Sequence, residues 1–245
     1  METNVFRRYE KKFLLTLEQW QSLLPTLEAH MDIDPYCLNG QPYTVRTVYF
    51  DTADYDVIRK SLDRPQFKEK LRMRKYGHFD VVNDEVYFEI KRKFKGIGTK
   101  RRVKCTETEV NSLIKDGYMP TKTDYYAVQI LREIGYYLNV NKVKPAVFIS
   151  YRRLAYTDRE NKQFRLTIDQ DILTRRDNFD FTHGPQGRRL IDDRHRLMEV
   201  KVGKAMPLWF AKALSEHKIY LTSFSKYGKD FEARMKKEFD PDEYI

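Results

Sequence analysis

The sequence is poor in cysteine and has no long apolar run. Its two cysteines, Cys37 and Cys105, form neither a CxxC pair nor a disulfide framework. No segment approaches the roughly 18 consecutive apolar residues that span a bilayer, and METNVFRRYEKKF lacks the apolar core of a signal peptide. We therefore expect a reducing, cytoplasmic setting in which both cysteines are buried structural thiols.

Motifs of several common enzyme classes are also missing. The sequence has no GxxxxGK[ST] loop, no HExxH and no GxSxG, which argues against a P-loop enzyme, a zinc protease of that type and an α/β-hydrolase. The segment KGIGTKR lacks the third glycine of a dinucleotide site. The five histidines are scattered, and we expect them on the surface or in loops.

Positive charge is what the sequence has in excess. Lys and Arg number 46 against 36 Asp and Glu, which gives a formal net charge of +10. Charged residues make up 33% of the chain, and an aromatic content of 14% excludes plain disorder. A folded chain with this balance implies a polyanionic partner: nucleic acid, anionic lipid or a phosphate-rich small molecule.

The chain reads as one domain over residues 1–245, since no repeat, low-complexity segment or flexible linker divides it. Strands are predicted at about 5–15, 43–50, 67–76, 84–94, 99–105, 144–156, 162–171 and 194–202. Helices are predicted at about 17–31, 54–61, 107–115, 124–138, 207–217 and 226–238. Because most strands follow one another without a helix between them, the pattern favours an α+β fold, with an antiparallel sheet or barrel and helices packed outside.

Several residues predict where individual helices begin, bend or end. Thr16 with Gln19 and Thr106 with Glu109 have the spacing of a capping box. Pro25 predicts a bend or a break in the first helix. Gly117 is typical of a helix C-terminus.

Five predicted strands alternate between an apolar face and a charged, mostly cationic face. The clearest is KEKLRMRKYG, where Lys70, Arg72 and Arg74 share one face opposite Leu71 and Met73. The other four apolar faces are Phe13 and Leu15; Phe88, Ile90 and Phe94; Phe164, Leu166 and Ile168; and Met198, Val200 and Val202.

A solvated outer face would explain one such strand, but neighbouring cations on five strands repel one another unless an anion lies between them. We therefore predict a closed sheet whose charged faces line a polar tunnel. Such a tunnel suits a chain of phosphates, because Arg matches phosphate oxygens bidentately and Lys adds point charges. Its carboxylates, Glu10, Glu89, Glu199 and Asp169, suit Mg²⁺ or Mn²⁺.

A set of segments in fixed order resembles a known family. The segments are RRYEKKFLL, KLRMRKYG, VYFEIKRK, SYRRLAY, FRLTID, LMEVKVG and FSKYG. Together they resemble the VTC domain, the polyphosphate polymerase module of the triphosphate tunnel metalloenzymes (CYTH-like superfamily), from about residue 5 to residue 235. The resemblance implies an antiparallel β-barrel tunnel of about eight strands with helices outside. It also implies transfer of the γ-phosphate of ATP to a growing polyphosphate chain with Mn²⁺ or Mg²⁺.

The resemblance also implies roles for individual residues. The cations that it places at the transferred phosphate are Arg72, Arg74, Lys91, Arg152, Arg165 and Lys226. Further substrate-binding residues are Glu10, Lys12, Glu89, Lys201 and Ser225, and the metal ligand is Glu199. Arg153 and Lys93 are expected to be solvated instead. The first strand reads Arg8-x-Glu10-x-Lys12 where the superfamily has ExExK, which favours the polymerase branch over a hydrolase.

Two other functions stay open. One is a metal-dependent triphosphatase that acts on inorganic or nucleoside triphosphate, and the other is a nonenzymatic module that binds polyphosphate or RNA. No RRM or KH signature supports specific nucleic-acid recognition. The resemblance implies ATP and polyphosphate as partners. A separately encoded membrane partner is compatible with the basic surface, and the expected location is the cytoplasm or the inner face of a membrane. The oligomeric state is open.

Overall fold

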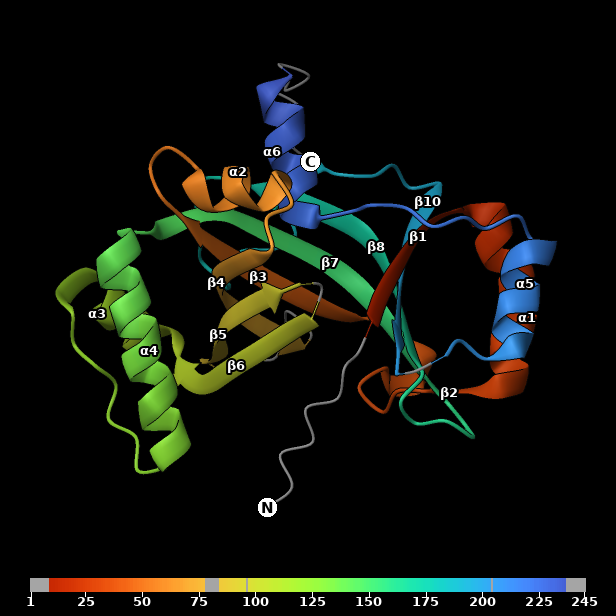
Figure 1. Cartoon of the computed structure of the whole chain (residues 1–245), viewed down its shortest axis with the longest axis horizontal. Coiled ribbons are helices and arrows are strands. Elements are labelled where there is room, and N and C mark those ends of the chain that lie inside the picture. Colours follow the sequence, from red (N-terminus) through yellow and green to blue (C-terminus); the bar gives the residue numbers. More distant parts are fainter. Residues whose placement is uncertain (1–8, 78–83, 96, 204, 237–245) are drawn as a thin grey trace. The chain divides into compact units, whose positions relative to one another are not determined.

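The computed structural model describes residues 9–77, 84–95, 97–203 and 205–236 (Figure 1). Arg8, the predicted strand start near residue 5 and the predicted helix end near residue 238 lie outside the described residues.

The predicted elements are present, with small shifts at their ends. The strands are β1 (Tyr9–Thr16), β2 (Met31–Ile33), β3 (Tyr43–Asp51), β4 (Phe67–Gly77), β5 (Glu85–Phe94), β6 (Ile97–Thr106), β7 (Lys144–Asp158), β8 (Arg165–Arg175), β9 (Arg188–Arg189) and β10 (His195–Val202). The helices are α1 (Leu17–His30), α2 (Asp56–Leu62), α3 (Glu107–Asp116), α4 (Tyr125–Asn141), α5 (Leu208–Glu216), α6 (Lys226–Met235) and the short 3₁₀ helix η1 (Leu38–Gly40). The short elements β2, β9 and η1 are absent from the prediction.

One large sheet contains all the strands, in the order β1-β10-β8-β7-β3-β4-β5-β6, with β2 beside β7 and β9 beside β8. The pairs β1–β10, β10–β8, β4–β5 and β5–β6 are antiparallel. The predicted α+β class with an antiparallel sheet and helices is therefore confirmed. The predicted closure of the sheet is not found in the described residues, where the hydrogen-bonded path is open, with β1 and β6 at its ends.

The helix signals are mostly confirmed. Thr16 and Thr106 each form a complete capping box with the residue three positions later. Gly117 ends α3 with a φ of 74°, a conformation that glycine adopts without steric cost. Of the two outcomes predicted at Pro25, the break is excluded because α1 continues through it to His30, and the bend stays a prediction. Burial of Leu23 and Leu27 on either side of the proline outweighs the lost backbone hydrogen bond.

The chain divides into two compact units, and each is built from three segments. Unit 1 contains the described parts of Met1–Thr44, Tyr151–Ile172 and Arg189–Ser225. Unit 2 contains those of Val45–Ser150, Leu173–Arg188 and Lys226–Ile245. The single domain over residues 1–245 stays a prediction.

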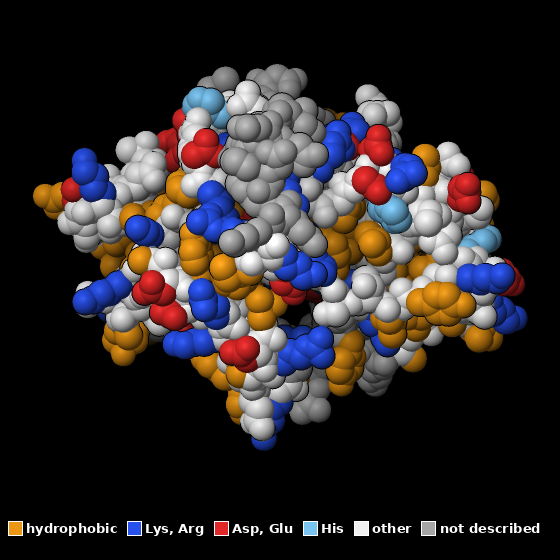
Figure 2. All heavy atoms as spheres, turned by 90° about the horizontal axis from the view of Figure 1, so that it is seen from above, with side chains coloured by type: hydrophobic (Ala, Val, Ile, Leu, Met, Phe, Trp, Pro, Cys, Tyr) orange, Lys and Arg blue, Asp and Glu red, His pale blue; other side chains and the backbone are white. Residues whose placement is uncertain are grey.

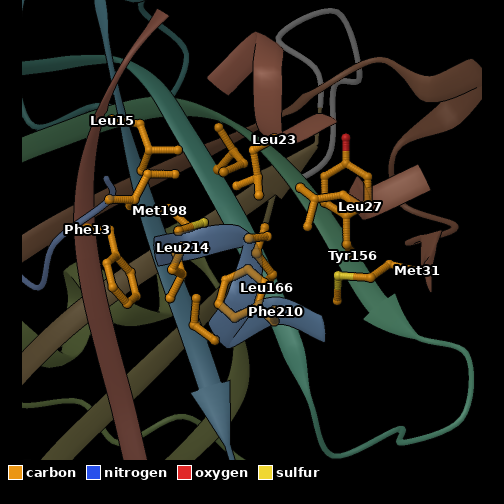
Figure 3. Close-up of a cluster of buried hydrophobic side chains, with 14 of the residues drawn as sticks. Phe13, Leu15, Leu23, Leu27, Met31, Tyr156, Leu166, Met198, Phe210 and Leu214 are labelled. Carbon is orange, nitrogen blue, oxygen red and sulfur yellow. The ribbon is translucent and has the colours of Figure 1, made fainter. Parts of the chain in front are cut away.

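The core of unit 1 lies where α1 and α5 pack on the apolar face of β1, β8 and β10 (Figure 3). Alternate residues of the strands, such as Leu15, Leu166 and Met198, are fully buried there with Leu27 and Phe210 of the helices. Truncation of one such side chain to alanine typically costs about 2–5 kcal/mol. The apolar faces predicted for these three strands are confirmed.

The core of unit 2 lies between α3, α4 and the apolar face of β4, β5 and β6 (Figure 1). The predicted apolar residues Leu71, Met73, Phe88 and Ile90 are buried. Phe94 is a correction, because it is 54% exposed. It is the last residue of β5, and its register partner Phe67 is similarly exposed, so this end of the strand pair is not covered.

Both cysteines are buried and unoxidised, as predicted. Among the described helices, none has the length and apolar character needed to cross a membrane.

Candidate functional site

The charged face of unit 2 is formed by alternate residues of β4, β5 and β6. Arg72 lies opposite Glu89 in the β4–β5 register, and Lys70 lies opposite Lys91. Across β5–β6, Glu89 and Lys91 lie opposite Arg102 and Lys100. Residues opposite each other share a face. We call this set the cationic face; its members are Lys70, Arg72, Arg74, Glu89, Lys91, Lys100 and Arg102.

Glu89 is the single carboxylate of the cationic face and is fully buried. Arg72 Nε donates to Glu89 Oε2 at 2.7 Å, and Lys100 Nζ lies 3.5 Å from Oε1. Burial alone would raise the pKa of Glu89, but Arg72, Arg74 and Lys100 outweigh it and lower the pKa to about 2. Glu89 is therefore ionised at neutral pH, and it holds the Arg72 guanidinium in place.

Arg74 is fixed by neutral partners. Its Nε donates to Thr47 Oγ1 at 3.0 Å, and its Nη1 lies 3.5 Å from the hydroxyl of Tyr76. Arg72 and Arg74 are 8% and 7% exposed, so both guanidinium groups are largely removed from water. Buried cations in excess of carboxylates create a strongly positive potential that favours a bound anion.

Tyr49 lies beside Lys70, Arg72 and Arg74 of the cationic face, and no sequence pattern pointed to it. The Tyr49 ring stacks on that of Tyr227 with 5.4 Å between centroids, and Lys70 Nζ lies 5.9 Å from the Tyr227 ring centre. Burial would raise the pKa of Tyr49, but Arg72, Arg74 and Lys70 lower it to about 7. Burial, followed by the neighbouring lysines, lowers the pKa of Lys70 to about 8 although Tyr49 opposes the shift.

Helix α6 brings Lys226 into unit 2. Lys226 is its first residue and is 8% exposed, whereas Ser225, which precedes the helix, is half-buried. The helix is fastened by Tyr227, whose hydroxyl donates to Asp51 Oδ2 at 2.6 Å, and by Asp230, which accepts from Thr174 Oγ1 at 2.8 Å. Tyr227, the residue after Lys226, also stacks on Tyr49.

In unit 1, the candidate metal ligand Glu199 lies beside Lys12. The two residues are opposite each other in the β1–β10 register, and Lys12 Nζ is 3.3 Å from Glu199 Oε1. Lys12 Nζ also lies 3.4 Å from Glu10 Oε1 and donates to the carbonyl of Phe224 at 2.8 Å. The structure thus brings together Glu10, Lys12 and Glu199 as predicted from strand alternation.

Arg153 completes this cluster, and the expectation that it is solvated is wrong. It is 8% exposed, donates to both oxygens of Asp169 at 2.6 and 2.7 Å, and places Nη2 3.4 Å from Glu199 Oε2. Burial alone would lower the pKa of Arg153, but Asp169, Tyr151 and Glu199 raise it well above its ordinary value. We call Glu10, Lys12, Arg153, Asp169 and Glu199 the carboxylate cluster.

Arg152, the neighbour to which the resemblance gave a role, is not brought to this cluster. Its side chain is 53% exposed and pairs with Asp171 at 2.7 Å. Successive residues of a strand face opposite ways, so only one of the two arginines can join Asp169. Strand β7 has no apolar–polar alternation around this pair, which left the choice between them open to error.

Arg165 and Lys201 lie at the exposed end of the same face. They are opposite each other in the β8–β10 register, and Lys201 is also opposite Glu10. Both residues are exposed. The pair Arg165–Lys201 lies two residues along the strands from the pair Thr167–Glu199, on the same face.

The carboxylate cluster offers oxygen ligands to a divalent metal. Within the part of the chain that the structure describes, no three His, Cys, Asp or Glu side chains form a ready-made metal cage. Glu199 and Glu10 still offer carboxylate oxygens, although Lys12 lies close to both. Mg²⁺ in proteins is commonly held by one or two carboxylates, with water and substrate phosphates as the other ligands. The residues therefore fit a metal that is bound together with a phosphate substrate.

Figure 2 shows the charged side chains on one face of the molecule. Lys and Arg side chains are spread over it, with Asp and Glu among them.

Comparisons with known proteins identify the family and the fold. A family model described as the VTC domain matches residues 7–233. A candidate adenylate cyclase from Bacillus halodurans has a similar solved structure, with 15% sequence identity, a TM-score of 0.54 and coverage of 89% of this chain and 95% of that one. This likeness shows the fold alone.

Two further solved structures are more distant. The PH1819 protein from Pyrococcus horikoshii OT3 matches at 10% identity and a TM-score of 0.47, with 93% of this chain and 99% of that one covered. The Mimivirus capping enzyme triphosphatase matches at 7% identity and a TM-score of 0.38, with 87% and 89% covered. No curated protein matches the sequence.

Proposed function

The chain belongs to the VTC domain family, and from this premise we propose that it is a polyphosphate polymerase that transfers the γ-phosphate of ATP to a growing chain. The observation that carries the proposal is the cationic face, where Arg72, Arg74 and four further cations surround the single carboxylate of Glu89. Both ATP and polyphosphate present a row of phosphates to such a face. One domain over residues 1–245 would hold the whole activity.

The cationic face would bind and orient the phosphates. Arg72 is held by Glu89 and Arg74 by Thr47, so neither guanidinium has to be reoriented when charge develops on the moving phosphoryl group. Preorganised donors of this kind are typically the largest single contribution to a barrier reduction. Lys91 and Lys226 would add further positive charge to the same substrate.

The carboxylate cluster would hold the metal. Glu199 would be its main ligand, with Glu10 as a second oxygen donor, while Lys12 and Arg153 keep the Glu199 carboxylate oriented. Bound Mn²⁺ or Mg²⁺ would supply charge neutralisation on the phosphate oxygens. Lys201, Arg165 and Ser225, which belong to the same unit as this cluster, would contact phosphates there.

The acceptor needs no protein base in this reaction. A terminal phosphate of the polymer is already anionic, so attack on the γ-phosphate requires only alignment and neutralisation of charge. The cations of the cationic face would provide the neutralisation of charge. A Ser, Cys or His nucleophile is not needed for such a transfer.

Hydrolysis of a triphosphate is a second candidate, and Tyr49 is the observation that favours it. Because Arg72, Arg74 and Lys70 outweigh burial and lower the pKa of Tyr49 to about 7, a large fraction of it is phenolate at physiological pH, and a phenolate can accept a proton from water. Water as the acceptor would need such a base, whereas a phosphate acceptor would not.

An incubation with ATP and Mn²⁺, followed by electrophoresis of the products, tests the proposal. A ladder of polyphosphate supports the polymerase, and free phosphate alone supports the hydrolase. Arg72→Ala should abolish the ladder, whereas Arg132→Ala, which changes an exposed arginine of α4, should leave it unchanged. A ladder of wild-type intensity from Arg72→Ala would remove the cationic face from the reaction.

A further inference from the structure

A basic hollow lies at one end of strands β4 and β5 in unit 2. Its volume is about 420 Å³, and it is lined by Arg64, Pro65, Gln66, Lys68, Lys93 and Lys95. Four of these six residues are cations and none is acidic. No role in the proposed reaction has been given to any of them.

The hollow continues the cationic face along the same two strands. After the opposed pair Lys70–Lys91, the next pair on the same face is Lys68–Lys93. Beyond that pair, Lys95 donates its backbone N–H to the carbonyl of Gln66 at 2.8 Å. Residues two apart on a strand repeat at roughly 6.7 Å, so the cations form an unbroken row from the cationic face into the hollow.

The cations of the hollow repel one another. Burial, followed by Lys93 and Arg64, lowers the pKa of Lys68. The Lys68 ammonium donates to the carbonyl of Ser61 at 2.6 Å, which holds it at the wall of the hollow. No carboxylate among the lining residues offsets this repulsion, so a bound anion would relieve it.

The chemistry of the walls favours a bare phosphate chain over a nucleic acid. Single-stranded nucleic acid is usually bound by cations together with free aromatic faces on which bases stack. Phe67 and Phe94, two exposed aromatic residues at this end of the strands, are opposite each other on the other face of the strand pair and do not line the hollow. The Phe94 ring already has the Lys95 ammonium 5.5 Å from its centre.

We propose that this hollow is a second anion subsite, which binds phosphate groups of a polyphosphate chain whose other groups lie on the cationic face. The identity of the ligand rests on the proposed function, while the existence of the subsite rests on the lining residues. The row of cations would let a long chain contact both places at once, whereas a chain of three phosphates would occupy only one.

Direct binding measurements without ATP or metal test this subsite. The double variant Lys93→Gln/Lys95→Gln removes two exposed charges from the hollow, and Lys115→Gln/Lys144→Gln removes two exposed charges elsewhere in unit 2. Each is titrated with long-chain polyphosphate, tripolyphosphate and single-stranded RNA at several salt concentrations. Thermal unfolding confirms that both variants are folded.

We expect the hollow variant to bind long-chain polyphosphate about tenfold more weakly and to show a salt slope smaller by about 2, one for each lost phosphate contact. Tripolyphosphate affinity should stay within about twofold of wild type, and the control variant should resemble wild type with every ligand. Equal weakening in both variants, or no weakening in either, would overturn the subsite. RNA that binds as tightly as polyphosphate and responds equally to the hollow variant would overturn the ligand class.

The outcome also separates this proposal from the previous one. If the protein forms no polymer from ATP but long-chain polyphosphate still binds through Lys93 and Lys95, the polymerase fails and the subsite stands. If polymer forms and the hollow variant binds normally, the subsite fails and the polymerase stands.

Discussion

Each cluster contains one arginine that is fixed by a carboxylate. Arg72 is held by Glu89, and Arg153 is held by Asp169, and all four side chains are buried. A guanidinium has five N–H groups in a fixed plane, so a carboxylate that binds part of them also sets the direction of the whole group. These pairs therefore provide orientation as well as charge.

The effect of the planar guanidinium of Arg72 can be measured separately from the effect of its charge. Arg72→Ala should reduce the rate of ATP turnover by about 10²–10³-fold, the usual effect of losing one preorganised donor. Arg72→Lys keeps the charge and loses the planar fork, so it should recover only a small part of that loss. Initial rates at saturating ATP measure both. Full activity of Arg72→Lys would show that charge alone is required.

The two neighbouring arginines of β7 should differ sharply in their effect on stability. Arg153→Met leaves Asp169 buried without its bidentate partner and should lower the free energy of unfolding by about 3–5 kcal/mol. Arg152→Met removes an exposed ion pair and should cost under about 1 kcal/mol. Urea denaturation compares the variants. Similar losses in both would contradict the burial of Arg153.

Tyr49 predicts a pH dependence. Its pKa is about 7 in the folded protein against an ordinary value of 10, so between these values the folded state holds fewer protons than the unfolded chain. The phenol's contribution to the free energy of unfolding therefore grows as pH rises from about 7 and is lost as pH falls through 7. The charged or titratable groups that face it are Arg72, Arg74, Lys70 and Tyr227.

Comparison of wild type with Tyr49→Phe isolates this contribution. Denaturant unfolding at several pH values between 6 and 10 should give a difference that increases with pH. In the activity assay, a base role predicts loss of phosphate release with retention of the polymer ladder. A difference that does not change with pH would contradict an ionised Tyr49.

The sequence could predict which residue types gather, but not every member of the site. Strands with a strict alternation carry Arg72 and Glu89 in unit 2 and Lys12 and Glu199 in unit 1, and the shared face within each unit followed from it. Strand β3, which carries Tyr49, is buried almost throughout. Its sequence therefore did not show which of its side chains share a face with the cations. The same lack of alternation in β7 hid the difference between Arg152 and Arg153.

At the scale of the element, a single carboxylate joins three segments of unit 2. Asp51 ends β3, and its Oδ1 accepts from the backbone N–H groups of Thr52 and Val57, both at 2.8 Å. Its Oδ2 accepts from the N–H of Ile58 at 3.0 Å and from the hydroxyl of Tyr227 at 2.6 Å. The start of α2 and the start of α6 are thus tied to the end of one strand.

Asp51→Asn should disrupt this junction. The amide has one oxygen in place of two, so buried N–H donors lose acceptors and the free energy of unfolding should fall by about 2–4 kcal/mol. Tyr227→Phe, which removes only the hydroxyl donor, should cost about 1 kcal/mol. Hydrogen exchange should show faster opening at Val57 and Ile58 in Asp51→Asn. Unchanged exchange there would argue against the junction.

Helices and strands were predicted more reliably than the surfaces of them that other segments cover. The capping boxes at Thr16 and Thr106 and the alternation of five strands are local features, and the structure confirms them. The continuation of α1 through Pro25 and the exposure of Phe94 depend on which surfaces other segments cover. Such tertiary coverage is not encoded in any short window of sequence.

At the scale of the whole molecule, both units share one construction. Each has helices over an apolar sheet face and a charged group on the alternate positions, so each has a core that is independent of its charged face. The chain passes repeatedly between the units, and the family match from residue 7 to 233 includes both. A change in the charged faces can therefore alter ligand binding without removing either core.

This separation leads to a prediction about anions. The net charge of +10 and the buried cations of the cationic face oppose folding through repulsion, and a bound polyanion removes part of that cost. Tripolyphosphate at about 100 times its Kd should stabilise the protein by about 2.7 kcal/mol and raise Tm accordingly. Sodium chloride at the same ionic strength screens surface charges only and should have a smaller effect, because buried groups are screened less.

A matched pair of variants assigns the effect to a place. Arg72→Gln should lose much of the tripolyphosphate shift, because it removes a buried guanidinium of the cationic face. Arg132→Gln lowers the net charge equally from an exposed position and should keep the shift. Differential scanning fluorimetry with and without tripolyphosphate measures both. If the two variants lost the shift equally, stabilisation would follow from overall charge, and the cationic face would have no special affinity for phosphate.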